Sequence, residues 1–301
     1  MLRPHLTQAR APLTRETSAL NEHGQTECVS IPAERALTVY VDRRELVTLM
    51  TLGAQPELLV LGFLRNQRLV RTLDEIESVS VDWDVGAAAV KTRRGLSDLR
   101  SRTARRVVTT GCGQGSMFGD LMDDLADLVL PPATLSQADL YGIVNTMRLQ
   151  ESTYKSAGSV HGCALFRGQE MLIFVEDVGR HNAIDTIAGW MWMQDEAPTL
   201  ATSCAALPPE GAVPCLGLPG AAASTMAGSD KVFYTTGRLT SEMVIKSAQM
   251  GVPILISRSG ITQMGLELAQ RLQLCTIGRA TNKRFLCYSA ADRIEFQIAT
   301  K

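Results

Sequence analysis

The residue with the clearest capacity for chemistry is Cys112, which lies in the segment Gly-Cys-Gly-Gln-Gly-Ser at residues 111–116. Three glycines in five positions disfavour both helix and strand, so the segment is expected to be a loop. A glycine-rich loop leaves the sulfur uncovered and gathers backbone N–H groups, which favours a thiolate. The alternative, a small apolar filler, suits Cys163, Cys275 and Cys287 better, because these lie in strand-like segments.

A second candidate is the polar segment 176–185, Glu-Asp-Val-Gly-Arg-His-Asn-Ala-Ile-Asp, which follows an apolar strand and opens a helix. Ligands of α/β proteins bind where strand ends meet helix starts. His181 and Asp185 are four residues apart and share a helix face, where the carboxylate can fix the imidazole tautomer. Four interpretations stay open: helix capping by Asp177, a solvated charged face, a metal site, and a polar wall that contacts a cofactor.

His161 is the other histidine near these segments. A lone histidine in a strand is more often structural than catalytic. Together with Cys112 and His181, however, it could form a thiolate–imidazolium pair. The sequence does not decide which histidine lies near the sulfur.

A helix start with a cation predicts an anion site. Gly237 and Arg238 stand just before the expected helix 241–250, whose N-terminus attracts negative charge. The same helix carries Glu242 and Lys246, which are four residues apart. The alternative to an anion site is therefore a surface ion pair between these two side chains, which contributes little stability.

A basic segment near the C-terminus suits phosphate binding. It follows the expected strand 274–277 and contains a glycine and three cations in seven residues. A charged surface turn has the same composition. The candidate residues are Gly278, Arg279, Ala280, Thr281, Asn282, Lys283 and Arg284.

Composition limits the class of protein. The net charge of −1 gives no general attraction to nucleic acid or to an anionic membrane, and no segment has the length and apolarity of a membrane span. The seven cysteines include no Cys-x-x-Cys pair. An odd number of reduced thiols fits a cytoplasmic protein better than a disulfide framework or a structural zinc site.

The pattern along the chain predicts an α/β fold with a smaller α+β domain. Residues 1–30 are polar and aperiodic, which predicts a flexible N-terminal arm. Residues 31–105 read as a small α+β domain with a hairpin and a helix that opens at Pro56. From residue 106 to residue 301 strands and helices alternate, interrupted by an Ala-, Pro- and Gly-rich insertion at 194–229.

Taken in order, these segments resemble the formate dehydrogenase accessory sulfurtransferase family, of the FdhD/NarQ type. The resemblance runs from about Ala33 to Tyr288 and is strongest in the segment 176–185. It is supported by Gly237-Arg238 with the following helix, and by the cysteine loop.

The resemblance implies a cytidine-deaminase-like, three-layer α/β domain joined to a small α+β domain. It implies that Cys112 receives sulfur from a cysteine desulfurase as a persulfide. The sulfur then passes to Mo-bis(molybdopterin guanine dinucleotide), the substrate, before this enters a formate dehydrogenase-type enzyme. The guanine-nucleotide half is expected near residues 278–284, the signature turn maps onto His181, Asn182 and Asp185, and the protein is expected to be a homodimer. No metal bound by the protein itself is implied, because the molybdenum arrives with the ligand.

The chain also departs from the family pattern. The family loop is typically Cys-x-x-Cys, and here Gly115 takes the second cysteine's place. A carrier needs one cysteine, yet the change also fits a chaperone that binds the cofactor without moving sulfur. A third alternative is a Cys–His hydrolase. Deamination is excluded because His161 is not followed by the glutamate that zinc deaminases need, and Pro214-Cys215 does not continue into a second cysteine.

Overall fold

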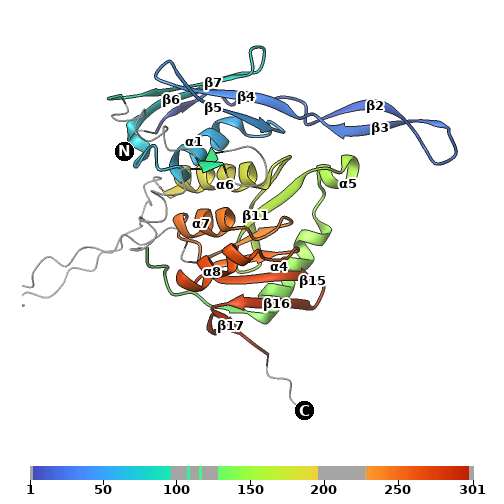
Figure 1. Ribbon diagram of the computed structural model, residues 1–301, viewed down its shortest axis with the longest axis vertical. Coiled ribbons are helices and arrows are strands. Elements are labelled where there is room, and N and C mark those ends of the chain that lie inside the picture. Colours follow the sequence, from blue (N-terminus) through green and yellow to red (C-terminus); the bar gives the residue numbers. More distant parts are fainter. Residues whose placement is uncertain are drawn as a thin grey trace, which may run out of the picture.

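The computed structural model describes residues 3–95, 107–108, 115–116, 128–195, 228 and 230–297. Cys112 and nearly all of the expected insertion at 194–229 lie outside the described residues. The described chain forms two large sheets, with helices between them and against the outer face of the second, and three pairs of shorter or projecting strands (Figure 1). No helix in this part of the chain has both the length and the apolar character that crossing a bilayer requires.

The N-terminal sheet has five strands in the order β1-β6-β7-β4-β5. Buried and exposed residues alternate along its strands, and Leu37, Val39 and Val41 point into the core. The expected hairpin is confirmed, and its two-residue turn has Asp42 and Arg43 at positive φ, as a turn of this kind requires. The strands are β1 (His5–Leu6), β4 (Arg35–Val41), β5 (Arg44–Thr51), β6 (Ile76–Asp82) and β7 (Ala87–Thr92), with the short helix η1 (Leu73–Glu75) before β6.

The expectation of a loose arm over residues 1–30 is wrong for much of that stretch. The first strand, β1, pairs in parallel with β6. Strands β2 (Thr14–Leu20) and β3 (Thr26–Pro32) form an antiparallel hairpin that projects from the sheet (Figure 1). Both faces of the hairpin are largely exposed, so its residues show no apolar alternation. Its regularity comes from backbone pairing and is not visible in the hydrophobic pattern.

The second sheet has six strands in the order β12-β11-β13-β14-β15-β16. Its central strands β13, β14 and β15 are parallel, and antiparallel strands lie on either side of them. The strands are β11 (His161–Arg167), β12 (Glu170–Asp177), β13 (Lys231–Thr235), β14 (Ile254–Ser257), β15 (Cys275–Thr281) and β16 (Arg284–Ser289).

Helices cover both faces of this sheet and make a three-layer arrangement. One core cluster joins the sheet to α6 (Arg180–Asp195), α7 (Ser241–Gln249) and α8 (Gln263–Arg271). Another joins the opposite face to α4 (Gln137–Leu149), whose N-terminus is capped by the side chain of Ser136. A mixed α/β fold is thus confirmed, and its assignment to the cytidine-deaminase type stays a prediction.

The remaining elements are small. They are α5 (Thr153–Ala157), η2 (Ala291–Arg293) and the two-residue strands β8 (Val107–Val108), β9 (Gly115–Ser116), β10 (Leu135–Ser136) and β17 (Ile294–Glu295).

Helix α1 (Pro56–Asn66) joins the two halves by packing on α6. The two helices approach closely at two glycines. A Cβ atom on Gly62 would collide with the carbonyl oxygen of Asp185, and one on Gly189 would collide with that of Leu58. Glycine is required at both positions because the two backbones are in contact there.

Candidate functional site

The signature segment 176–185 is buried between the two halves of the molecule. Asp177 ends β12 and is 3% exposed. Its Oδ2 accepts hydrogen bonds from the Thr51 hydroxyl at 2.5 Å and the Leu52 N–H at 3.1 Å, and its Oδ1 accepts one from the Gly179 N–H at 3.1 Å. Burial raises the pKa of Asp177, and these donors oppose the rise.

Asn182 extends the same connection. Its side-chain amide donates to the Asp177 Oδ1 at 2.8 Å and to the Met50 carbonyl at 2.6 Å. The end of β5 is therefore hydrogen-bonded to the turn that starts α6. Of the four interpretations of this segment, a solvated charged face is wrong, because Asp177, Asn182 and Asp185 are at most 3% exposed.

Asp185 takes part in a buried ion network. Lys246 Nζ lies 2.8 Å from Asp185 Oδ2 and 3.2 Å from Glu242 Oε1, and Asn66 donates to Asp185 Oδ1 at 2.7 Å. Burial alone would lower the pKa of Lys246, but the two carboxylates outweigh burial and raise it. The expected surface pair between Glu242 and Lys246 is thus present but buried, since the Lys246 side chain is 2% exposed.

The carboxylate beside His181 is not the one expected. Asp185 bonds to Lys246 and Asn66, and Glu242 Oε2 lies 3.3 Å from His181 Nε2 instead. Burial lowers the pKa of His181 to about 3, despite the opposing effect of Glu242. His181 is therefore neutral at pH 7.

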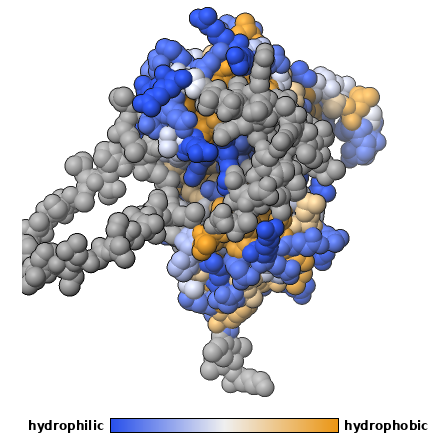
Figure 2. Space-filling model, turned by 60° about the vertical axis from the view of Figure 1, so that its left-hand side comes forward, coloured by the Kyte–Doolittle hydropathy of each residue, from blue (hydrophilic) through white to orange (hydrophobic). Residues whose placement is uncertain are grey.

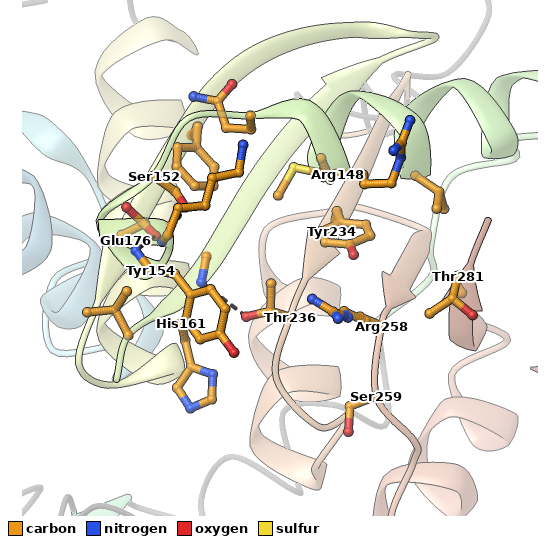
Figure 3. A pocket seen from close by; sticks show the side chains of 18 of the residues that line it. Arg148, Ser152, Tyr154, His161, Glu176, Tyr234, Thr236, Arg258, Ser259 and Thr281 are labelled. Carbon is orange, nitrogen blue, oxygen red and sulfur yellow. Dashed lines mark hydrogen bonds between the residues drawn. The ribbon is translucent and has the colours of Figure 1, made fainter. Parts of the chain in front are cut away.

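A cavity of about 680 Å³ opens on the side of the second sheet that faces α4 and α5. Figure 3 shows His161 and Tyr154 on one side of it and Arg258 and Thr281 on the other. The lining consists of these residues together with Val144, Met147, Arg148, Gln150, Ser152, Lys155, Val160, Gly162, Phe174, Glu176, Tyr234, Thr236, Ser259, Ala280 and Asn282.

Positive charge predominates among the ionisable groups of the lining. Arg148, Lys155 and Arg258 bring three cations, whereas the carboxylate of Glu176 already accepts from the backbone N–H groups of α5. Lys155 pairs with the exposed Glu151 at 3.2 Å, a contact that solvent weakens. The cavity is therefore suited to an anionic ligand.

Aromatic rings border the same space. Tyr154, Phe174 and Tyr234 line the cavity, and burial raises the pKa of Tyr234 to about 12 while the nearby Arg258 opposes the rise. Aromatic rings can stack on a nucleotide base, and the neighbouring cations can bind its phosphates.

His161 reaches this cavity from the first residue of β11. The next residue, Gly162, donates its N–H to the Thr236 hydroxyl at 3.1 Å, which fixes the strand end beside the wall (Figure 3). Burial lowers the pKa of His161, and the positive charges of Arg180 and Arg238 lower it further. The imidazole is thus held in its neutral form, which can accept a proton.

The predicted histidines do not lie at one site. His161, Ala280, Thr281 and Asn282 line one cavity. His181 and Asp185 belong to the buried network and are absent from its lining among the described residues.

The predicted anion site at Gly237 and Arg238 lies beside this cavity without lining it. The side chain of Arg180 packs on Gly237, where a Cβ atom would lie 2.7 Å from the Arg180 Cδ. Arg238 is exposed, and its charge acts on the His161 imidazole. Cys112 lies outside the described residues, so its distance from His161 stays untested.

The expected phosphate-binding loop is a β-hairpin. Strand β15 continues to Thr281, Asn282 and Lys283 form the turn, and Arg284 begins β16. The glycine serves packing, because a Cβ atom on Gly278 would lie 2.7 Å from the Tyr288 ring. Among these residues Gly278, Arg279, Lys283 and Arg284 do not line the cavity.

Arg148, Tyr154 and Arg258 are cavity residues that the sequence analysis did not single out. A signal was available for Arg258, since it directly follows the parallel strand β14. Ligands of α/β sheets gather at the carboxyl ends of such strands. Arg148 and Tyr154 had no comparable signal, because they come from α4 and α5 outside the sheet.

Comparison with known proteins shows the family to which the chain belongs. The sequence matches the model of the FdhD/NarQ family over residues 32–205 and 218–295. The chain belongs to the FdhD/NarQ family. Membership confirms the resemblance on which the sequence analysis relied, and it covers both halves of the fold.

Curated relatives in this family are similar along most of their length. The sulfur carrier protein FdhD of Geobacillus kaustophilus is 27% identical over 265 residues, which is 88% of this chain and 89% of the relative. The protein of the same name from Bacillus licheniformis is 28% identical over 264 residues, with 87% and 89% covered.

A solved structure shares the fold. It is that of a formate dehydrogenase accessory protein from Desulfotalea psychrophila, and it superposes with a TM-score of 0.67 over 94% of this chain and 100% of the other. The two sequences are 22% identical.

Proposed function

We propose that this protein is a sulfur carrier that takes sulfur from a cysteine desulfurase as a persulfide on Cys112. It delivers the sulfur to the molybdenum cofactor of a formate dehydrogenase-type enzyme. The observation that carries the proposal is membership of the FdhD/NarQ family, whose curated relatives are named sulfur carrier proteins.

The cavity supports the second half of the proposal. The substrate, Mo-bis(molybdopterin guanine dinucleotide), carries phosphates and guanine bases. Arg148, Lys155 and Arg258 supply cations for the phosphates, and Tyr154 and Tyr234 supply rings for a base. We place the guanine-nucleotide half here, against Ala280 and Thr281 at the end of β15 and Asn282 in the turn that follows.

The loading step is a thiol exchange. The Cys112 thiolate attacks the outer sulfur of the desulfurase persulfide, a new S–S bond forms on Cys112, and the desulfurase leaves as a thiolate. In the second step the S–S bond on Cys112 would break, Cys112 would be released as a thiolate, and the outer sulfur would bond to the cofactor, the substrate, which would supply the two electrons that reduce it to sulfide. We assign to the neutral His161 the role of accepting a proton from the Cys112 thiol.

The test is to load sulfur and locate it. The reduced protein is incubated with a cysteine desulfurase and cysteine, and tryptic peptides are analysed by mass spectrometry. One added sulfur, about 32 Da, is expected on Cys112. Cys28→Ala serves as the matched control, because Cys28 is an exposed thiol on β3. An adduct pattern without Cys112 would refute the carrier role.

Gly115 favours a second candidate, a cofactor-binding chaperone that moves no sulfur, because it replaces the family's second loop cysteine. The two candidates predict opposite results in a formate dehydrogenase maturation assay. A carrier loses its effect when Cys112 becomes Ala. A chaperone keeps its effect in Cys112→Ala but loses it in Arg258→Met, which removes a cation from the cavity.

A further inference from the structure

Two cysteines lie on neighbouring strands at the edge of the six-stranded sheet, outside the cavity lining. Cys275 begins β15 and is fully buried, and Cys287 lies in β16 and is half-buried. Both side chains pack in the same apolar cluster, where the Cys275 thiol is close enough to the Cys287 thiol to act as its hydrogen-bond donor. The Cys287 thiol also donates to the Ser289 carbonyl oxygen at 3.3 Å. Both cysteines are free. Two free thiols that lie in contact can be oxidised to a disulfide.

The strand register explains how they meet. Cys287 is opposite Ile277, so Cys275 is its diagonal neighbour on the same face of the sheet. Diagonal pairs of a regular ladder are usually too far apart for a disulfide. Here the register shifts between Thr276 and Ile277, with Tyr288 as the additional residue of β16, and the thiols are in hydrogen-bonding contact.

The position of β16 permits the remaining adjustment. It is the last strand of the sheet and is hydrogen-bonded on one side to β15. An edge strand can shift by a fraction of an ångström without breaking a second ladder. The movement that a disulfide between β15 and β16 requires can therefore be taken up by the edge strand β16.

The two thiols differ in reactivity. The hydrogen bond from Cys275 lowers the pKa of Cys287 to about 7, although partial burial opposes this. The same bond, together with burial, raises the pKa of Cys275. Cys287 is thus the thiolate near neutral pH, and it is also the more accessible sulfur. Cys163 offers a contrast, because full burial raises its pKa to about 12.

We infer that Cys275 and Cys287 form a reversible redox pair, in which a hydroperoxide oxidises Cys287 and Cys275 resolves the product to a disulfide. This site is separate from the proposed sulfur-carrier site at Cys112. It requires neither the desulfurase nor the molybdenum cofactor.

A hydroperoxide is the oxidant that converts the two thiols to a disulfide. The Cys287 thiolate attacks the terminal oxygen, the O–O bond breaks, and the leaving oxygen takes a proton to become water or an alcohol. Cys287 is then a sulfenic acid. The Cys275 sulfur attacks it, the S–O bond breaks, and the thiol proton leaves with the hydroxyl group as water. Two thiols and one hydroperoxide become one disulfide, and a dithiol reductant restores the thiols.

The test maps the disulfide in the full-length protein. The reduced protein is treated with hydrogen peroxide and then denatured in the presence of an alkylating reagent that blocks every remaining free thiol. The alkylated chain is digested with trypsin without reductant. Cleavage after Arg271, Arg279, Arg284 and Arg293 places the two cysteines on separate peptides, 272–279 and 285–293. We expect these peptides joined, two hydrogens lighter than their sum, and separated again by dithiothreitol.

Two variants test the assigned order. In Cys275→Ala the sulfenic acid cannot be resolved, so dimedone is expected to label Cys287. In Cys287→Ala we expect Cys275 to stay a free thiol after the same peroxide treatment. Dimedone labelling of Cys275 in that variant would reverse the roles and contradict the inference.

The wild-type result decides the inference even if a variant fails to fold. Complete alkylation of both cysteines after peroxide treatment would overturn it, and so would a disulfide from either of them to another cysteine. Cys163 serves as the internal control, since it is buried beside Thr235 and is expected to be alkylated only after denaturation.

Discussion

Lys246 carries its charge in the interior of the protein, and this is possible because two carboxylates surround it. Asp185 and Glu242 lie 2.8 Å and 3.2 Å from its Nζ. An ion pair of this kind stabilises a fold little compared with apolar residues of the same shape, but removal of one partner leaves a buried charge without compensation. The network therefore makes each of its members sensitive to substitution.

We expect Lys246→Met to lower the free energy of unfolding by about 3–5 kcal/mol, because Asp185 then lies buried without its cation. Chemical denaturation at pH 7 measures the change. The double variant Asp185→Asn with Lys246→Met removes both charges and should recover about 2 kcal/mol of this loss. Strictly additive single-variant effects would show that the two residues are not coupled.

His181 should make stability fall on acidification. Its pKa is about 3 in the folded protein against 6.5 as the ordinary value, so between these values the unfolded chain binds more protons. From pH 7 to pH 5 this costs about 2 kcal/mol. His181→Gln should lose less stability over this interval than the wild type. Asp177 has a raised pKa and acts in the opposite direction, but it is common to both proteins.

The cavity depends on where elements end. Thr236 and Arg258 follow the parallel strands β13 and β14, and Tyr154 comes from the short helix α5. Segments that are distant in sequence thus place a cation and a ring around one space. Because the backbone of Arg258 directly follows β14, the sheet fixes the point from which its guanidinium reaches the cavity.

Arg258→Met should weaken the binding of guanosine diphosphate about tenfold, since one charge-assisted contact is lost. Isothermal titration calorimetry at fixed salt measures the affinity. Arg271→Met is the matched control, because Arg271 is exposed at the end of α8 and does not line the cavity. Equal weakening by both substitutions would indicate a general charge effect and no specific contact.

The crossing of α1 and α6 depends on two glycines. A Cβ atom at Gly62 or Gly189 would meet backbone atoms of the other helix, which cannot move aside as a side chain can. We expect Gly62→Ala to lower the free energy of unfolding by about 3 kcal/mol, measured by denaturant titration. Gly260→Ala, where a Cβ atom meets nothing within 4 Å, should change it by less than about 0.5 kcal/mol.

On the scale of the whole molecule, α6 belongs to two cores. Ala183, Ile184 and Ile187 lie in the core of the six-stranded sheet, whereas Trp192 lies in that of the N-terminal sheet. Neither core is complete without this helix. On the face drawn in Figure 2, hydrophilic and hydrophobic residues are interspersed.

The shared helix predicts one cooperative thermal transition in calorimetry. Asp177→Ala leaves the buried donors of Thr51 and Leu52 without an acceptor, so the midpoint should fall by roughly 5 °C while the transition stays single. Glu176→Ala is the control, because among the described residues the Glu176 carboxylate accepts from the start of α5 and does not bond to β5. Two separated transitions would show that the halves unfold independently.

Much of the fold followed from the sequence because burial leaves a periodic pattern. The hairpin of β4 and β5 and, in the described part of residues 106–301, the alternation of strands and helices were predicted from such patterns. The hairpin of β2 and β3 was missed, because exposed strands have no apolar face that a pattern could mark.

The sequence by itself determined the family, because the signature segment 176–185 is specific in residue type and order. It also singled out His161 and residues 280–282, which line the cavity. Only the tertiary structure decided that Asp177, Asn182 and Asp185 join the two halves instead of lining the cavity. The physical reason is that residue type alone does not distinguish a buried structural polar residue from one that binds a ligand. The two differ in their hydrogen-bond partners, and these come from distant parts of the chain.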